Sequence, residues 1–394
     1  MPNVFSGVIL EHTMNIGIDI RPLMTKNKTG VGEYTYELLS AVFKLDTKNQ
    51  YYLFYNAVKN YNLKNLPWQQ DNVHYIESRY PNKIFNLALT LKLIKIDQFI
   101  PVKIDCWYAP NLNFFNLSST IPYILTIHDL SFKLFPEFYT AKQNFWHKII
   151  GSKRQCQSAK LIIVPSANTK RDLMNYYEIP KEKIEVIYPG VNDNFSLTNP
   201  NLAADKTRVL NRYGLPENFI LFLGSIEPRK NITTIIKAYE KLPLEITAKY
   251  SLIIVGAPGW KNKEIYDTAT KSPLASNIKF IGYIAAEDKP IFYSLSSLFI
   301  FDSFYEGFGF PLIEAMRMGT PTIAANRASL PEITDNASYL VNPNKISDLS
   351  QAMKILLTDT ELKNSYIKKG HAVAENYSWE KAAANWLTTI AKII

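Results

Sequence analysis

Short apolar runs with strand character alternate with segments of helical periodicity along almost the whole chain of 394 residues. The first run covers 14–20, and a turn rich in Lys, Thr and Gly then leads into apolar residues at helical spacing over 31–45. Parallel strands need long crossover connections, usually helices, and these helices cover both faces of the sheet. The alternation therefore predicts an α/β protein built on parallel sheets. Further strand-like runs lie at 51–55, 105–108, 123–127 and 161–164, and helical patterns lie at 85–96, 141–157 and 168–177.

A second alternation follows a polar, Asn-rich stretch at 192–206, and we place a domain linker in that stretch. We predict two Rossmann-like, doubly wound domains, 1–197 and 198–376. They would face a central cleft at the carboxyl ends of their strands, where such sheets bind ligands. Residues 377–394 are predicted to form an amphipathic helix, and the first domain is one candidate partner for its apolar face. In the second domain, strand-like runs lie at 219–223, 251–255, 278–281, 298–301 and 321–324, and helical patterns lie at 232–242 and 312–318.

Composition and charge exclude several classes of protein. No apolar stretch approaches the roughly 18 to 20 residues that cross a bilayer, and Glu11 and His12 interrupt the place where a signal peptide needs an apolar core. We therefore expect a cytoplasmic protein.

The two cysteines, Cys106 and Cys156, have no metal-ligand spacing and are expected to be reduced and structural. Lys and Arg number 44 against 35 Asp and Glu, which favours anionic partners. The excess is spread along the chain without a basic, aromatic-interleaved motif, so nucleic acid is not an expected partner.

The most informative segment is 304–316, which follows a predicted strand. Its glycines lead into a predicted helix whose first turn contains Pro311, a position that proline tolerates. A glycine loop that enters a helix presents free backbone N–H groups to an anion, typically phosphate. Glu306 and Glu314 flank this entry, and their carboxylates suit the hydroxyls of a sugar or ribose beside that phosphate. The alternative is a solvated Glu306 and a Glu314 that only complements the helix dipole.

A second group of residues, in 221–231, ends the first strand of the second domain. Arg229 and Lys230 stand in the predicted strand-to-helix loop, with Asn231 as a plausible N-cap. Adjacent cations at this edge of the sheet can neutralise a diphosphate, Arg through its planar fork and Lys as a point charge. The alternative for a basic dipeptide in a loop is solvated surface.

Together these two segments resemble a large family, the retaining, nucleotide-sugar-dependent glycosyltransferases with the GT-B fold, often called family 4. The likeness rests on Glu306 and Glu314 in the setting EGFGFPLIEAM and on Gly224 followed by Arg229-Lys230-Asn231, and it extends from Met14 to the end of the chain. The resemblance implies that Glu306 holds donor-sugar hydroxyls, Glu314 the ribose, and Arg229 and Lys230 the diphosphate. It also implies contacts with phosphate or sugar from three residues of the glycine loop, namely Gly307, Phe308 and Gly309.

Two features of the first domain agree with the resemblance. Gly30 and Gly32 lie in a loop after the first strand, where the family brings backbone close to the donor; a lone tight turn is the alternative. His128 and Asp129 follow the strand at 123–127, and the resemblance implies that His128 contacts the donor sugar and Asp129 supports it. A hydrogen-bonded structural histidine is the alternative. The amino-acid sequence of residues 128–137 is similar to that of bacterial mannosyltransferases of surface-polysaccharide assembly. This similarity favours GDP-mannose as the donor.

The expected chemistry needs no metal and no cofactor beyond the nucleotide-sugar co-substrate, because no loop carries an Asp-x-Asp pair and no histidines cluster with acids. Cations and helix N-termini would stabilise the departing diphosphate, so Arg229, Lys230, Glu306 and His128 are the predicted catalytic residues. The resemblance implies retention, by substitution on one face of the sugar. The competing functions are a nucleotide-sugar hydrolase or epimerase and a non-catalytic subunit that binds nucleotide sugar.

The acceptor is expected on the first domain, as a glycan or a lipid-linked molecule. Basic and aromatic residues there could also attach the protein peripherally to the inner face of the plasma membrane. The alternative is a soluble helix with a solvated basic face. The residues singled out for this surface are Tyr80, Lys83, Phe85, Lys92 and Lys95.

Overall fold

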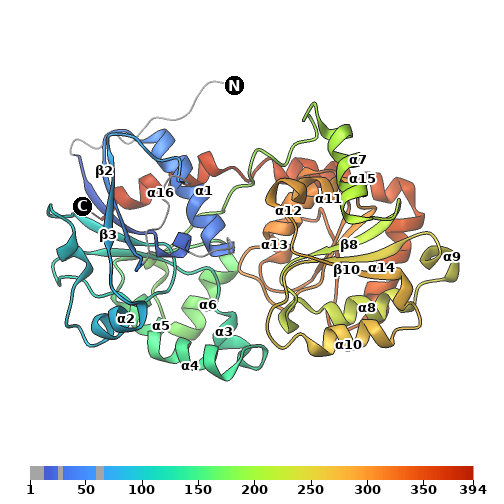
Figure 1. Ribbon diagram of the computed structural model, residues 1–394, viewed down its shortest axis with the longest axis horizontal. Helices are drawn as coiled ribbons and strands as arrows, with labels where there is room; N and C mark the ends of the chain where they lie inside the picture. The colour runs from blue at the N-terminus through green and yellow to red at the C-terminus, as the bar shows by residue number, and fades with distance from the viewer. Residues whose placement is uncertain (1–12, 25–29, 59–65, 394) are drawn as a thin grey trace.

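Two α/β domains lie side by side in the computed structural model, which describes residues 13–24, 30–58 and 66–393 (Figure 1). The first domain is built on a seven-stranded sheet of order β3-β2-β1-β4-β5-β6-β7, and the second on a six-stranded sheet of order β10-β9-β8-β11-β12-β13. Every pairing between these named strands is parallel. The prediction of two doubly wound parallel-sheet domains is therefore confirmed.

The inner strands of the first sheet are buried on both faces, and the edge strands β3 and β7 are partly exposed. Ile16 of the inner strand β1 pairs with Tyr51 on one side and Cys106 on the other. Such Ile-, Val- and aromatic-rich runs fit a parallel sheet that is covered on both faces. Its strands are β1 (Asn15–Asp19), β2 (Gln50–Asn56), β3 (Val73–Ser78), β4 (Cys106–Ala109), β5 (Tyr123–Thr126), β6 (Leu161–Val164) and β7 (Ile184–Val186). Its helices are α1 (Gly30–Leu45), α2 (Asn82–Thr90), α3 (Ser131–Leu134), α4 (Ala141–Ile150), α5 (Ser152–Ser158) and α6 (Ala167–Tyr177), with short 3-10 helices η1 (Arg21–Met24), η3 (Ile96–Phe99), η4 (Pro136–Phe138) and η5 (Lys181–Lys183).

The second sheet repeats this arrangement, and its central strand β8 is buried at every position. The strands are β8 (Phe219–Leu223), β9 (Ser251–Val255), β10 (Ile278–Gly282), β11 (Leu298–Phe301), β12 (Thr322–Ala325) and β13 (Tyr339–Val341). The helices are α7 (Leu202–Tyr213), α8 (Ile232–Glu240), α9 (Leu244–Thr247), α10 (Lys263–Lys271), α11 (Lys289–Leu295), α12 (Phe310–Arg317), α13 (Leu330–Thr334), α14 (Ile346–Thr358) and α15 (Thr360–Ala374), with η6 (Pro228–Lys230), η7 (Ala275–Asn277) and η8 (Ala286–Asp288). The last helix of the chain, α16 (Trp379–Ala391), packs on the first domain.

Each sheet separates two hydrophobic cores, one on each face. In the first domain, one core joins the sheet to α1 and the other joins it to α2, α5 and α6. In the second domain, residues of α7, α11 and α12 fill one core, and residues of α8, α10 and α14 fill the other. Burial on both faces is what fixes the doubly wound topology, because each helix covers apolar sheet surface with its own apolar stripe.

The chain crosses between the domains a second time near its end. α16 lies beside α1 in the first domain (Figure 1), and its Ala382, Ala383 and Trp386 belong to a first-domain core. The chain segments that make the two crossings are in contact, because the backbone N–H of Val191 in the first donates to the carbonyl oxygen of Tyr377 in the second at 3.3 Å. Gly190 is required at this point, because a Cβ there would lie 2.1 Å from Trp379 N.

Two further expectations can be compared with the structure. Cys106 and Cys156 are both free and buried. Phe85 is 1% exposed in the core under α2, so the expectation that it meets an acceptor was wrong; it is the apolar anchor of its helix.

Within the described ranges, none of the helices combines the length and the apolar character needed to span a bilayer.

Candidate active site

Three charged residues meet where β8 and β11 end. These neighbouring strands run parallel, so the segments that follow them lie at the same edge of the second sheet. Arg229 and Lys230 are in η6 after β8, and Glu306 is in the loop after β11. Lys230 Nζ is 2.6 Å from Glu306 Oε1, and Arg229 Nη1 is 2.9 Å from Glu306 Oε2. The structure thus brings together residues that are 76 positions apart.

This cluster is buried and strongly coupled. The side chains of Arg229, Lys230 and Glu306 are only 13%, 10% and 11% exposed. Burial alone would raise the pKa of Glu306, but attraction to Arg229 and Lys230 outweighs it and lowers that pKa to about 2. The carboxylate is therefore ionised at neutral pH and acts as the counter-ion of both cations.

Arg229 is held by further contacts and keeps one donor without a partner. Its Nη2 lies 2.7 Å from Glu227 Oε1, and its Nη1 also donates to the carbonyl of Tyr305 at 2.7 Å. Its Nε is buried and has no hydrogen-bond partner among the described residues. A buried, charged donor without a partner is expensive to maintain, and an anionic ligand could satisfy it.

Asn231 does not act as the predicted cap. It occupies the N-cap position of α8 in the left-handed region at φ 56°, but its side chain makes no capping hydrogen bond. Instead its Nδ2 donates to Asp302 Oδ2 and to Pro343 O, both at 2.9 Å. Asn231 therefore ties η6 to the segment after β11, because Asp302 immediately follows that strand. Burial raises the pKa of Asp302 to about 8.

The glycine loop after β11 is shaped by contacts with the first domain. A Cβ on Gly307 would lie 1.8 Å from the carbonyl oxygen of His128, so only glycine lets the two domains approach this closely. Gly309 has φ 112°, a backbone conformation that favours glycine, and precedes α12 with Pro311 in its first turn. The Ser329 hydroxyl contacts the carbonyl oxygens of residues 306 and 308, both at 2.9 Å, and fixes the loop.

Phe308 differs from its expected role. Its side chain is 4% exposed and packs in the second-domain core against Phe310 and Tyr377. Any contact of this residue with a ligand must therefore come from its backbone.

Glu314 lies in α12, in a separate buried group. Its Oε1 is 2.6 Å from Lys289 Nζ, and its Oε2 accepts from the Tyr293 hydroxyl at 2.8 Å. Burial raises the pKa of Glu314, opposed by Lys289, and Glu33 in α1 of the first domain adds to the increase. Glu306 and Glu314 are thus held by different partners.

Lys289 and Tyr293 were not found by the sequence analysis. They stand in α11, more than twenty residues before Glu314, and the only signal in the sequence is a lysine at the start of a helix. A lysine or a tyrosine at that distance from a glutamate in the sequence does not by itself indicate a binding site.

His128 and Asp129 follow β5 after one intervening residue and face the glycine loop. His128 Nε2 lies 2.9 Å from the carbonyl of Pro110, which can only accept, so Nε2 carries the proton and Nδ1 is left as an acceptor. Burial lowers the pKa of His128, which keeps the imidazole neutral at neutral pH. Asp129 Oδ1 accepts from the N–H and hydroxyl of Ser131, at 2.8 and 2.6 Å. Its charge also acts on Arg229 across the domain boundary.

Gly30 and Gly32 are in the first turn of α1, not in the loop where they were expected. A Cβ on Gly30 would have no heavy atom within 4 Å, so packing does not require glycine there. Thr29 and the rest of the preceding turn lie outside the described residues.

Several contacts between the domains were also missed. Glu332 in α13 accepts from the backbone N–H groups of Ala167 and Asn168, at 2.7 and 2.9 Å, and so caps α6 of the other domain. The hydroxyl of Tyr305 donates to Asp172 in the same helix. These partners are more than 130 positions apart, and no local pattern reveals them.

No group of three or more His, Cys, Asp or Glu side chains that could hold a metal ion occurs in the part of the chain that the structure describes. The prediction of metal-independent chemistry therefore stays a prediction.

Two family models match most of the chain. Residues 29–195 match the family described as Glycosyltransferase Family 4, and residues 205–373 match Glycosyl transferases group 1. O-antigen chain mannosyltransferase B of Escherichia coli is 26% identical over 361 residues, which are 89% of this chain and 93% of that protein. The serotype-specific mannosyltransferase WbdA of Escherichia coli is 31% identical over 66% of this chain, but the match spans only 32% of WbdA.

The fold has close counterparts among solved structures. Anabaena HepE, solved in complex with UDP and glucose, superimposes with a TM-score of 0.70 at 18% identity, and the match covers 97% of this chain and all of that one. At that level of identity the likeness concerns the fold.

Proposed function

Because the chain belongs to the family 4 and group 1 glycosyltransferases, whose matches cover 29–195 and 205–373, we propose that it transfers mannose from GDP-mannose. The acceptor is a glycan or a lipid-linked molecule in the synthesis of a bacterial surface polysaccharide, and the reaction takes place in the cytoplasm, with a lipid-linked acceptor presented at the inner face of the plasma membrane. Relatives named as mannosyltransferases, at 26% and 31% identity, support the choice of sugar.

The observation that carries the proposal is the buried cluster of Arg229, Lys230 and Glu306 at the edge of the second sheet. A diphosphate that binds there competes with Glu306 for the two cations. Once they pair with the diphosphate, the Glu306 carboxylate can accept hydrogen bonds from hydroxyls of the donor sugar. The Arg229 Nε adds a donor that the described protein groups leave unused. HepE was solved in complex with UDP, which is consistent with a nucleotide diphosphate on this fold.

The same groups would stabilise the transition state. Negative charge grows on the diphosphate as the glycosidic bond breaks, and fixed cations in a buried site stabilise that charge without having to reorient. Arg229 and Lys230 would thus supply the positive charge that a divalent metal ion would otherwise provide, so we propose a metal-independent reaction. His128 presents neutral Nδ1 as an acceptor for a hydroxyl of the donor sugar, and Glu314 with Lys289 would hold the ribose end.

We propose that the anomeric configuration is retained by substitution on one face of the sugar. The departing phosphate then takes the proton of the acceptor hydroxyl. A double displacement would need a carboxylate nucleophile beneath the anomeric carbon. Recovery of a covalent mannosyl-enzyme adduct by mass spectrometry would contradict the one-face substitution.

The test begins with calorimetric titration of the protein with GDP, UDP and ADP in the presence of EDTA, followed by the sugar nucleotides that match the base that binds. We expect GDP to bind most tightly. The protein is then incubated with GDP-mannose and a fluorescently tagged, α-linked mannose oligosaccharide. An elongated oligosaccharide supports the proposal. Free mannose without elongation would identify a hydrolase, an altered sugar nucleotide an epimerase, and binding without any product a non-catalytic subunit.

A further inference from the structure

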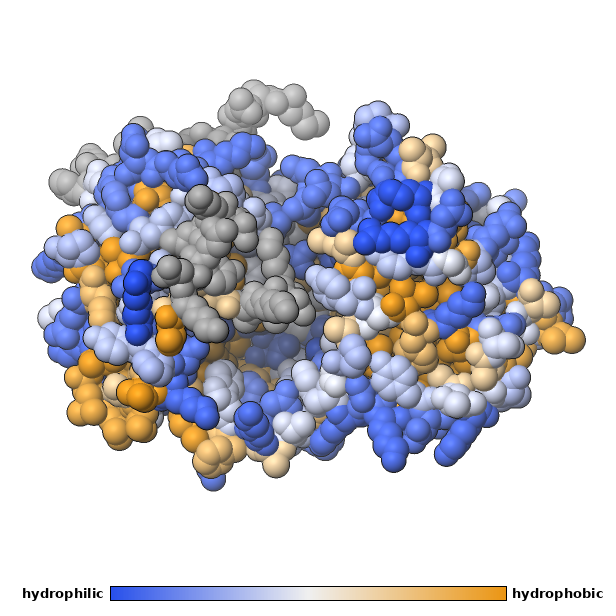
Figure 2. All heavy atoms as spheres, in the orientation of Figure 1, coloured by the Kyte–Doolittle hydropathy of each residue, from blue (hydrophilic) through white to orange (hydrophobic). Residues whose placement is uncertain are grey.

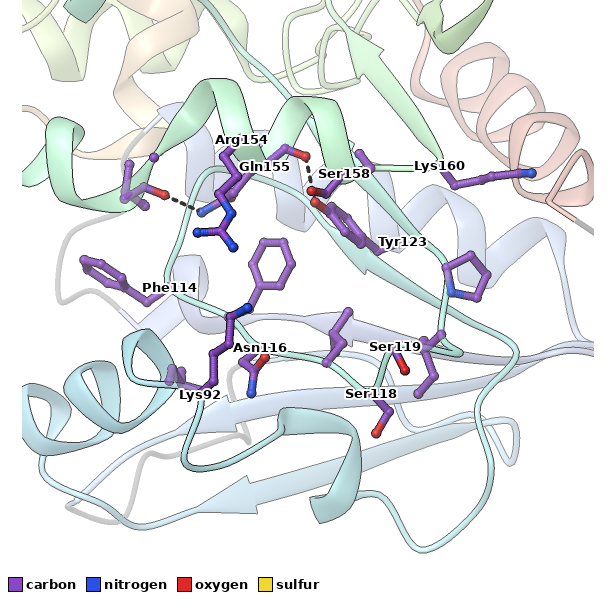
Figure 3. Close-up of a pocket in the computed structure, with 18 of the residues that line it drawn as sticks. Lys92, Phe114, Asn116, Ser118, Ser119, Tyr123, Arg154, Gln155, Ser158 and Lys160 are labelled. Atoms are coloured by element: carbon purple, nitrogen blue, oxygen red, sulfur yellow. Dashed lines mark hydrogen bonds between the residues drawn. The ribbon is translucent and has the colours of Figure 1, made fainter.

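A cavity of about 740 Å³ lies in the first domain (Figure 3). The end of α2, the segment that leads into β5, the end of α4, the start of α5 and the residues before β6 line it. Pro122 and Lys160, which precede β5 and β6, belong to its wall. The cavity is therefore at the amino edge of these parallel strands, whereas His128 and the glycine loop meet at their carboxyl edge. It is a separate site from the candidate active site.

The cavity wall is cationic. Its charged residues are Lys92, Arg154, Lys160 and Lys183, and no Asp or Glu lines it. Figure 3 shows Lys92 and Arg154 reaching into the same space from opposite walls, the lysine from beyond the end of α2 and the arginine from α5. Two cations that face each other without a carboxylate between them repel, and a bound anion would remove that repulsion. Serine hydroxyls at Ser118 and Ser119 add possible donors to the same wall.

The two chain segments beside the cavity share this charge. Residues 80–95 and 141–160 contain eight Lys and Arg side chains and not one Asp or Glu. The chain as a whole has 35 acidic residues, and their absence from both segments favours positive potential beside the cavity. One carboxylate does lie next to the wall, because Asp97 Oδ1 accepts from the backbone N–H of Ser118 at 2.9 Å. One of the eight, Lys153, pairs with Glu178; Lys92 and Arg154 have no such pair among the described residues.

Exposed apolar side chains stand on and after two helices, α2 and α4, whose ends line the cavity. On and after α2, Ile84, Leu87 and Leu93 are 63%, 59% and 73% exposed, and Figure 2 shows hydrophobic side chains gathered over this helix. On α4, Phe145 and Ile149 are 64% and 46% exposed. Large apolar side chains gathered on a protein surface mark an interaction site. Because they flank a cationic cavity, the partner must offer apolar and anionic groups close together, as a membrane interface does.

We propose that this cavity binds the phosphate head group of an anionic phospholipid while the exposed side chains of α2 and α4 enter the membrane interface. The surface would hold the first domain on the membrane with the catalytic cleft on a different edge of the sheet. The inference does not depend on the identity of the donor, because binding to lipid needs neither nucleotide nor acceptor.

Sedimentation with sucrose-loaded vesicles tests the proposal. One set contains phosphatidylglycerol and phosphatidylcholine in a one-to-two ratio, and the other contains phosphatidylcholine alone. We expect the wild type to sediment with the anionic vesicles only. The double variant Lys92→Glu/Arg154→Glu should lower the partition coefficient by about tenfold or more, since each basic residue near an anionic surface contributes measurably to binding.

The matched control reverses two exposed lysines of the second domain, Lys354→Glu/Lys368→Glu, and should change the partition coefficient less than about twofold. An equal fall of the partition coefficient in both double variants would mean non-specific electrostatic attraction and would overturn the proposal that the cavity binds lipid. The apolar contribution is tested with Leu87→Ser/Phe145→Ser, which should also weaken sedimentation. No loss in this variant would contradict insertion of α2 and α4 into the interface.

A soluble ligand is the remaining outcome. Calorimetric titration with inorganic phosphate, without vesicles, should give no saturable binding in the millimolar range. Saturable binding that disappears in Lys92→Glu/Arg154→Glu would assign the cavity to a soluble phosphate compound and overturn the lipid assignment. Circular dichroism and thermal unfolding of every variant establish that the fold is intact, and failure of the wild type to sediment with anionic vesicles overturns the proposal outright.

Discussion

Lys230 combines two roles at the scale of a single residue. Its ammonium group forms an ion pair with Glu306 and lies 4.9 Å from the centre of the Phe301 ring, so its position is fixed before any substrate arrives. A fixed charge stabilises a developing anion more effectively than a mobile one, because it does not have to reorient during the reaction.

We expect Lys230→Ala to lower kcat by about 10²- to 10³-fold, as is usual for loss of one preorganised electrostatic group. Initial rates with the donor at saturation measure the effect, and Lys237→Ala, an exposed lysine on α8, is the control. Turnover within a factor of about three of wild type would remove Lys230 from the catalytic groups.

Glu306→Gln tests the counter-ion role. The change leaves two buried cations without their shared carboxylate and should lower the free energy of unfolding by about 3 kcal/mol at neutral pH. The folded-state pKa of Glu306, about 2, lies below its ordinary value of 4.5. The stabilisation is therefore complete above about pH 4.5 and is lost as the pH falls towards 2.

Urea unfolding of both proteins between neutral pH and pH 3 measures this difference, which should shrink as the solution becomes more acidic. A difference that stays constant, or grows, at low pH would contradict the assignment. Because the variant removes a competitor for the cations, GDP should bind it at least as tightly as the wild type.

At the scale of elements, the glycine loop between β11 and α12 determines how closely the two domains can approach. A Cβ at Gly307 would meet the His128 carbonyl oxygen at 1.8 Å, and that oxygen belongs to backbone that cannot move aside cheaply. The loop therefore controls the gap in which the sugar would lie.

Gly307→Ala should leave each domain folded and push the loop away from β5. We expect kcat/KM to fall at least about tenfold, because a misplacement of about 1 Å at a reacting site can reduce the rate by two orders of magnitude. Ser276→Ala, at an exposed position in η7, is the control. Equal activity of Gly307→Ala and wild type would show that the close approach at Gly307 is not needed for catalysis.

At the scale of the whole molecule, the two domains are joined by covalent crossings and by polar contacts near the site. Glu332 takes part in several of these contacts, since it caps α6 through two backbone N–H groups and also accepts from the Tyr188 hydroxyl at 2.9 Å. A carboxylate at a helix N-terminus is stabilised by both hydrogen bonds and the helix dipole.

Glu332→Ala should weaken the contact between the two domains, because two backbone donors lose their partner. We expect a larger radius of gyration in small-angle X-ray scattering and a higher KM for the donor, with little change in kcat at saturation. Glu361→Ala, on the exposed first turn of α15, is the control. An unchanged radius of gyration and KM would show that Glu332 does not hold the domains together.

The sequence by itself determined the α/β class, the repetition of the architecture and the charged residues at the strand ends. It could do so because strand and helix periods are local, and because the carboxyl ends of parallel strands always meet at one edge. For the same reason it could place Arg229 and Lys230 near Glu306 without knowing the distances.

Only the tertiary structure decided which groups pair. Lys289 and Tyr293 hold Glu314, Asn231 bonds to Asp302 instead of capping α8, and Gly30 belongs to a helix instead of a loop. Phe85 and Phe308 turned inward although their neighbours in sequence are exposed or lie at the site. Pairing and burial depend on packing between segments far apart in the chain, and no short-range pattern in the sequence carries that information.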